Sequence, residues 1–292
     1  MLKGPFLHFK KDSKSITNSY FIALIPLLIF SFYKNGILLY CHNLIDFKDI
    51  FIPIYFYILS IIVGIIIAII HKESPKEYIL SSLIVTSTIS LNSNMLIFPI
   101  LLFVSIFIMK YLSNLKKITF NYISVVRILL ILSLLINSYS YLNVLEKIGK
   151  FNYDLFDIFL GYNIGGIATT STFIIIFSFL ILLANKFYKK EISFSAILSF
   201  GILGILWSIF SHDYLNFLLS GHVYFSFIFM APDIYISPYT KKGMIFYGIL
   251  IGTLTFIFSL FLKYEAPFIA IFLASFIIPV INKVTTKKYL QK

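Results

Sequence analysis

Long apolar runs fill this sequence, and they decide what the chain can fold into. Each run is bounded by charged or turn-forming residues, and each is close to the roughly 20 residues that a helix needs to cross a bilayer. The pattern therefore predicts an all-α, polytopic membrane protein with about ten transmembrane helices. The predicted spans are residues 17–33, 49–70, 78–91, 95–112, 122–138, 167–185, 193–210, 214–231, 244–262 and 265–281.

The composition leaves little room for any other kind of domain. Only 12% of the 292 residues are charged, 59% are hydrophobic and the mean hydropathy is +0.94, whereas a soluble domain has about 25% charged residues. Ten spans would leave only ~90 residues for loops and tails. The single cysteine, Cys41, excludes a disulfide framework and a zinc or iron–sulfur site built from several thiolates of this chain.

The lysines predict the orientation in the membrane. With ten spans, 18 lysines fall on the side that holds both termini and 5 fall on the other side, which leaves Arg127 inside a span. Because cytoplasmic loops carry the excess of Lys and Arg, we expect both termini to be cytoplasmic in a multi-pass protein of a bacterial cytoplasmic (inner) membrane. The net charge of +12 is then explained by lysines that lie almost all on one side of the lipid bilayer, and nucleic acid is not expected as a partner.

Two of the predicted spans suggest an internal repeat. Spans 78–91 and 214–231 are short for a full crossing and occupy comparable places in the two halves of the chain, as in transporters built from repeats. We therefore predict two five-helix halves. The predicted parts are a cytoplasmic N-terminal segment at 1–18, a first half at 19–138, an extracytoplasmic connector at 139–166, a second half at 167–282 and a cytoplasmic tail at 283–292.

Arg127 is the one charged residue placed well inside a predicted span. An arginine near the centre of a transmembrane helix costs about 2.5–3.5 kcal/mol on insertion scales, so its position requires an explanation. Either the side chain faces inward and holds a phosphate, a carboxylate or a helix end, or it extends back to the cytoplasmic interface. The sequence leaves both interpretations open.

A polar, glycine-rich stretch at 161–172 precedes the sixth predicted span. Its residues Thr170 and Ser171 are suited to facing an anionic ligand at a helix start, although an ordinary Ser/Thr cap explains the spacing as well. A phosphate-binding loop of the Walker type is excluded because the Gly-Lys-Ser/Thr ending is missing.

Other polar residues near span ends give weaker signals. His222 and the pair His212–Asp213 are candidates for a proton relay, and interfacial histidines explain them as well. The stretch 233–243 is a basic turn with Pro238 and Gly243. No Ser/His/Asp, paired-carboxylate or metal-ligand constellation occurs, so neither catalytic residues nor a metal site is predicted.

Short motifs occur in a characteristic order along the whole chain. They are Lys3–His8, Ile22–Pro26, Phe120–Arg127, Phe159–Ser171, Leu218–Gly221, Phe229–Asp233, Lys242–Gly248 and Ile278–Ile281. In this order they resemble one family, the RnfD membrane proteins of the Rnf-type electron-transport complex, which are closely related to the NqrB proteins of the sodium-pumping NADH:quinone reductase. The stretch Phe120–Arg127 is similar to the family's Phe-Asn-Pro-Ala-x-x-x-(Arg) signature, with Tyr122 in place of the proline.

This resemblance implies a subunit of a redox-driven ion translocase and not an independent enzyme. Such a complex couples electron transfer to sodium or proton movement and contains other membrane and peripheral subunits. In the family, FMN is joined through a phosphoester to a threonine after the fifth helix. Here Ser140 stands at that place, between Tyr139 and Tyr141.

The site residues implied by the resemblance and the polar stretches are few. Ser140 would carry the flavin phosphate. Tyr139 and Tyr141 are suited instead to stacking on a flavin ring, and interfacial tyrosines of an aromatic belt explain them equally well. Arg127, Thr170 and Ser171 are further candidates for cofactor binding.

The sequence also departs from the family's pattern. The connector is short, bulky tyrosines flank Ser140, and Thr169 replaces a glutamate of the family's motif. Alternatives are therefore a flavin-free or noncovalent subunit, a purely structural subunit of the same complex, and a small-solute channel or permease.

Overall fold

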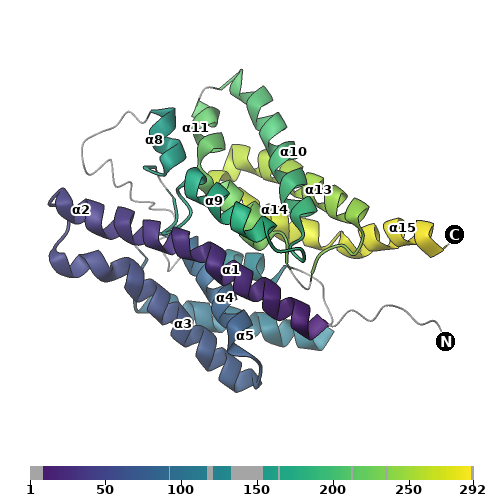
Figure 1. The fold of residues 1–292 in the computed structure, drawn as a ribbon, viewed down its shortest axis with the longest axis horizontal. Coiled ribbons are helices and arrows are strands. Elements are labelled where there is room, and N and C mark those ends of the chain that lie inside the picture. The colour runs from purple at the N-terminus through teal and green to yellow at the C-terminus, as the bar shows by residue number, and fades with distance from the viewer. Residues whose placement is uncertain are drawn as a thin grey trace.

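A computed structural model describes residues 9–91, 93–116, 121–132, 154–163, 165–211, 213–233 and 236–290. All the regular secondary structure in these ranges is helical (Figure 1), so the all-α prediction is confirmed for the described part of the chain. Within the described ranges, four segments are long and apolar enough to cross a membrane, and further apolar helices are shorter. The four are Lys14–Cys41, Phe47–His71, Lys190–Ser208 and Lys241–Ser275.

The first two crossings are longer than the predicted spans. Helix α1 (Phe9–Phe32) continues without interruption through a π-helical turn, η1 (Tyr33–Ile37), into α2 (Leu38–Cys41). A 3₁₀ turn, η2 (Phe47–Phe51), then leads into α3 (Ile52–His71). The first predicted span at 17–33 was therefore too short at both ends. At its C-terminal end the helix continues past residue 33, because the polar residues Lys34 and Asn35 are buried inside the protein.

The remaining elements are mostly shorter than a full crossing. They are α4 (Pro75–Ser87), α5 (Ile97–Lys116), α6 (Tyr122–Leu132), α8 (Leu155–Leu160), α9 (Thr172–Leu183), α10 (Lys190–Ser208), α11 (Asp213–Leu219), α12 (Gly221–Phe225), η3 (Ser226–Met230), α13 (Lys241–Leu262), η4 (Lys263–Glu265), α14 (Ala266–Ser275) and α15 (Ile278–Leu290).

Further predicted spans differ from the observed helices. The span at 167–185 begins too early, since α9 starts at Thr172. The span at 78–91 ends early, since α4 stops at Ser87. The span at 214–231 is two helices, separated at Ser220 and followed by a π-helical turn. The last span at 265–281 is divided between α14 and α15, and α15 continues through residues assigned to the tail.

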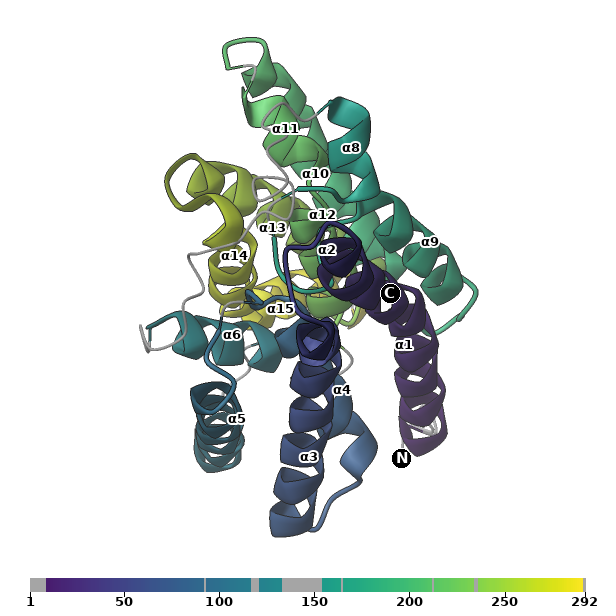
Figure 2. The same cartoon turned by 90° about the vertical axis from the view of Figure 1, so that its left-hand side faces the viewer.

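Helices from distant parts of the sequence pack side by side around a common core. Helix α1 packs against α9, and α6 packs against α14, so the early and late parts of the chain are joined at two places. Figure 1 shows α1 running along the front of the molecule next to α9, and Figure 2 shows α3 and α5 on the side opposite α10 and α11. Helix α1 begins and α15 ends at the same side of the molecule (Figure 1).

Helices α10 and α13 pack extensively against each other, and small residues let them approach closely. A Cβ atom on Gly252 would lie 2.5 Å from the carbonyl oxygen of Ala196, and one on Gly248 would collide with Ser195. Gly248 and Gly252 are four residues apart and therefore lie on one face of α13. Small residues at this spacing let two helices approach closely in a membrane, where packing and not water exclusion drives association.

Candidate functional site

Four interruptions of the helices meet in the interior of the protein. They are the end of α4, the loop before α9, the break between α11 and α12, and the η4 turn before α14. Backbone groups freed by these interruptions bond to one another, as groups buried within a membrane protein must. The bonds are Ile167 N to Ile89 O (2.8 Å), Ala168 N to Ser87 O (3.0 Å) and Gly221 N to Thr170 O (3.3 Å).

The loop before α9 approaches the end of α4 closely because it contains Gly166. A Cβ atom on Gly166 would lie 2.7 Å from both the carbonyl carbon and the carbonyl oxygen of Thr88. Real Cβ atoms do not come this near to backbone atoms, so any other residue at this position would push the loop away. The glycine-rich stretch therefore serves helix–loop contact at this point.

Arg127 lies at the centre of this region with its side chain fully buried. Its Nη2 atom is 3.3 Å from the carbonyl oxygen of Thr88 and 3.3 Å from Oε1 of Glu265. The guanidinium carbon is 5.1 Å from the ring centre of Phe268. The side chain of Arg127 therefore faces inward, as the first of the two interpretations expected. It contacts both a helix end and a carboxylate.

The two partners of Arg127 lie at helix ends of suitable polarity. Thr88 is the C-terminal cap of α4, and Glu265 directly precedes α14. A helix carries partial negative charge at its C-terminus and partial positive charge at its N-terminus. The C-terminal end of α4 thus favours the positive charge of Arg127, and the N-terminal end of α14 favours the negative charge of Glu265.

Arg127 retains unused hydrogen-bonding capacity. Its Nε and Nη1 atoms are buried and have no acceptor among the described residues. Buried donors normally find a protein or water acceptor, and a bidentate pair would have used two guanidinium nitrogens. Glu265 therefore holds the guanidinium through a single contact of 3.3 Å.

His222 connects the loop before α9 to the same cluster. Its Nδ1 atom is 2.9 Å from Oγ1 of Thr169, which also accepts a hydrogen bond from the Gly166 backbone at 3.2 Å. The imidazole ring packs edge-on against Phe268, with ring centres 5.3 Å apart. Thr169, where the family's pattern has a glutamate, therefore lies in the polar centre.

The other predicted site residues have different surroundings. Ser171 caps α9, since its Oγ accepts a hydrogen bond from the backbone of Ile174 at 3.2 Å. Thr170 is buried, and its hydroxyl has no hydrogen-bond partner among the described residues. Ser140, Tyr139 and Tyr141 lie outside the described residues, as does His212.

Sequence reasoning missed two charged residues of the interior. Lys34 was assigned to a loop, but its Nζ atom is buried and donates to the Asn163 carbonyl at 2.8 Å. The neighbouring Asn35 donates to the carbonyl of Ile167 at 2.9 Å. Glu265 was taken as the edge of the last span. The sequence carried no signal for Glu265, because its neighbour Lys263 in the same short turn is exposed while Glu265 is buried.

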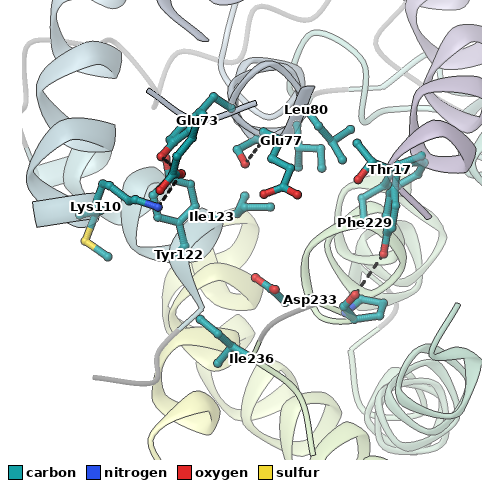
Figure 3. Close-up of a pocket in the computed structure, with 16 residues that line it drawn as sticks. Thr17, Glu73, Glu77, Leu80, Lys110, Tyr122, Ile123, Phe229, Asp233 and Ile236 are labelled. Carbon is teal, nitrogen blue, oxygen red and sulfur yellow. Dashed lines mark hydrogen bonds and ion pairs between the residues drawn. The ribbon is translucent and has the colours of Figure 1, made fainter. Parts of the chain in front are cut away.

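A cavity of about 490 Å³ opens where α1, α4, α5, α6 and the segment after η3 come together. Its walls carry three carboxylates, of which Glu77 and Asp233 point into it (Figure 3). The third, Glu73, pairs with Lys110 at 2.8 Å and accepts a hydrogen bond from Tyr78 at 2.6 Å. Burial alone would raise the pKa of Glu73, but these two bonds and the charge of Lys110 together lower it. The cavity adjoins loops that the lysine pattern assigns to the cytoplasm.

The turn after η3 is tied to neighbouring elements. Lys189, just before α10, donates to the carbonyl oxygen of Asp233 at 3.0 Å. Thr240 caps α13 by accepting from the backbone of Gly243 at 3.1 Å. Burial lowers the pKa of Lys189 to about 8, and the charge of Asp233 opposes that change.

Comparison with known proteins identifies the family of this chain. The model of the NQR2, RnfD, RnfE family matches residues 1–291. A 133-residue stretch, 44% of this chain, is 32% identical to a subunit of the proton-translocating ferredoxin:NAD(+) oxidoreductase complex of Clostridium ljungdahlii (strain ATCC 55383 / DSM 13528 / PETC). That match spans 40% of the relative's length. Because the family model covers almost the entire sequence, the chain belongs to the NQR2, RnfD, RnfE family of polytopic membrane proteins.

Proposed function

We propose that this protein is a membrane subunit of an Rnf-type complex that couples electron transfer to the movement of sodium or protons. The family match over residues 1–291 is the observation that carries the proposal. The name of the Clostridium relative supports reduced ferredoxin as the electron donor, NAD⁺ as the acceptor and the other subunits of such a complex as partners. The lysine distribution supports a bacterial cytoplasmic membrane with both termini inside.

The interior of the chain suits an ion-conducting subunit. A buried arginine and a buried carboxylate are costly inside a membrane and mark functional positions there. They lie where helices are interrupted, the usual place for ion and substrate sites in transporters. A structural subunit would not need such a centre, because apolar residues of similar volume would pack at least as stably.

The proposal includes FMN bound through Ser140. Its hydroxyl supplies the oxygen that a phosphoester needs, and its sequence neighbours Tyr139 and Tyr141 are aromatic residues of the kind that stack on flavins. When bound, a flavin relays electrons singly or in pairs. This part of the proposal depends on the sequence resemblance alone.

Intact-mass spectrometry of the denatured subunit, with peptide mapping over residues 137–150, tests the flavin. We expect an adduct of the mass of FMN on Ser140, lost in Ser140→Ala and kept in Ser140→Thr, since threonine has the same hydroxyl. An unmodified chain from a host that transfers flavin to other proteins would contradict covalent FMN and favour a flavin-free subunit.

A small-solute permease is the second candidate function. Interrupted helices meeting in the interior, together with a cavity of about 490 Å³, also favour a substrate site. The two functions differ in what they require, because a permease works without electron transfer and without redox partners.

Purification of the tagged chain from its native membrane separates the candidates. We expect peripheral and membrane oxidoreductase subunits to copurify, and deletion of the gene to abolish ferredoxin-dependent NAD⁺ reduction by the membranes until the gene is restored. A chain that purifies alone, and whose deletion stops uptake of a solute without changing the redox activity, would support the permease instead.

A further inference from the structure

The cavity among α1, α4, α5 and α6 ends one helical turn from the buried ion pair. Ile84 of α4 and Ile123 of α6 both line it. Thr88 and Arg127 each follow these residues by four positions, so they lie on the same helix faces about 6 Å further in. These are the two residues joined by the 3.3 Å contact between the guanidinium and the helix end.

The geometry of the Arg127–Glu265 ion pair allows the two side chains to separate. One guanidinium nitrogen meets one carboxylate oxygen at 3.3 Å, while two other nitrogens of Arg127 have no acceptor among the described residues. A pair that served stability alone would be bidentate and fully bonded, because a buried charge is otherwise costly. Arg127 can turn from Glu265 and still keep its bond to the end of α4.

Two further oxygen atoms suited to a small cation belong to the cluster that contains the Glu265 carboxylate. The carbonyl of Thr88 shares Arg127 with Glu265, and the Thr169 hydroxyl belongs to the same cluster through His222 and Phe268. Carboxylate, carbonyl and hydroxyl oxygens are the ligands that hard cations prefer. Broken helices in transporters supply the same kinds of group to coupling ions.

We propose that the Glu265 carboxylate holds the translocated monovalent cation inside the membrane and that Arg127 leaves Glu265 when the cation binds. This inference rests on the proposed function and assigns the ion to one site. The cation reaches the site from the cavity past the turn that ends in Thr88 and Arg127. With the cation bound, the centre carries one additional positive charge. That charge is costly in a medium of low dielectric constant, so the site holds its ion only briefly.

The test is ion uptake by inverted membrane vesicles that contain the whole complex, driven by reduced ferredoxin and NAD⁺. Radioactive sodium and a dye that reports acidification are followed separately, with a protonophore added in the sodium assay, so that sodium and proton transport are distinguished. For Glu265→Gln we expect NAD⁺ reduction to continue while ion uptake per NAD⁺ falls about tenfold or more, the loss expected when ~1.4 kcal/mol of binding is removed. The matched control is Glu191→Gln in the first turn of α10, for which we expect an unchanged uptake ratio.

A second variant keeps the test decisive if Glu265→Gln does not assemble because Arg127 loses its partner. Arg127→Met combined with Glu265→Leu removes both charges, and such replacements of a buried pair are often neutral or stabilising. We expect this double variant to assemble and to lose ion uptake. Normal uptake in either variant would overturn the inference, and so would failure of both to assemble, because the pair would then serve the fold alone. Vesicles of the unaltered complex that move no ion would instead refute the proposed function.

Discussion

Arg127 is stabilised by features that lie far apart in the sequence. The C-terminal end of α4, the carboxylate of Glu265 and the ring of Phe268 surround its guanidinium group. The helix end and the carboxylate each favour a positive charge, and the aromatic face adds a cation–π contact. Together they offset the cost of placing an arginine inside the membrane.

Replacing Gly166 by alanine should destabilise the polar centre. The added methyl group would meet the carbonyl of Thr88 at 2.7 Å, and overpacking of this kind costs about 1–3 kcal/mol. We expect a lower thermal unfolding temperature of the detergent-solubilised protein. The matched control is Gly201→Ala, where a Cβ atom meets nothing within 4 Å; equal effects of the two substitutions would contradict the close contact.

The stability of the protein should increase with pH through Lys189. Burial lowers the pKa of Lys189 in the folded protein to about 8, whereas an unfolded chain has an ordinary lysine pKa of about 10.4. Between these values the unfolded chain binds more protons, so the free energy of unfolding rises with pH, by at most about 1.4 kcal/mol per pH unit.

Thermal unfolding in detergent between about pH 8 and pH 10 measures this effect. We expect the increase in Lys189→Met to be smaller than in the unaltered protein, because the titrating group is gone. The same pH dependence in both proteins would show that Lys189 does not contribute.

At the scale of the elements, apolar runs in the sequence located the helices but not their interruptions. The break at Ser220 and the end of α4 at Ser87 both lie inside apolar runs. No proline occurs at either interruption, and Gly221 is the single glycine next to one of them. These interruptions are stabilised by partners from elsewhere, such as the Thr170 carbonyl that accepts from Gly221. Such contacts are tertiary, and hydropathy carries no information about them. Arg127 was recognised from its cost in the membrane, but Glu265 could not be assigned as its partner for the same reason.

The close contact between α10 and α13 should depend on Gly252. Replacing it with valine would force the helices apart, because even one Cβ atom would lie 2.5 Å from the Ala196 carbonyl. We expect Gly252→Val to reduce the yield of folded, monodisperse protein in size-exclusion chromatography. Gly201→Val on α10, at a position with open space, should leave the elution profile unchanged, and a similar loss in both variants would contradict the role of Gly252.

At the scale of the whole molecule, the orientation in the membrane can be tested with the natural cysteine. Cys41 is exposed at the end of α2, which the lysine pattern places on the extracytoplasmic side. We expect a membrane-impermeant maleimide to label Cys41 in intact cells whose outer barrier has been made permeable. In a Cys41→Ser background, Ser74→Cys, in the loop before α4, should be labelled only after the membrane is broken. The opposite labelling pattern would invert the topology.

The whole protein, as proposed, is a subunit of a redox-driven ion translocase. The most direct test compares inverted membrane vesicles from cells with and without the gene, supplied with reduced ferredoxin and NAD⁺. We expect NAD⁺ reduction with accompanying sodium or proton uptake in vesicles from cells with the gene, loss of both in vesicles from cells without it, and recovery of both when the gene is restored. Unchanged electron transfer and ion uptake in vesicles that lack the chain would contradict this proposal.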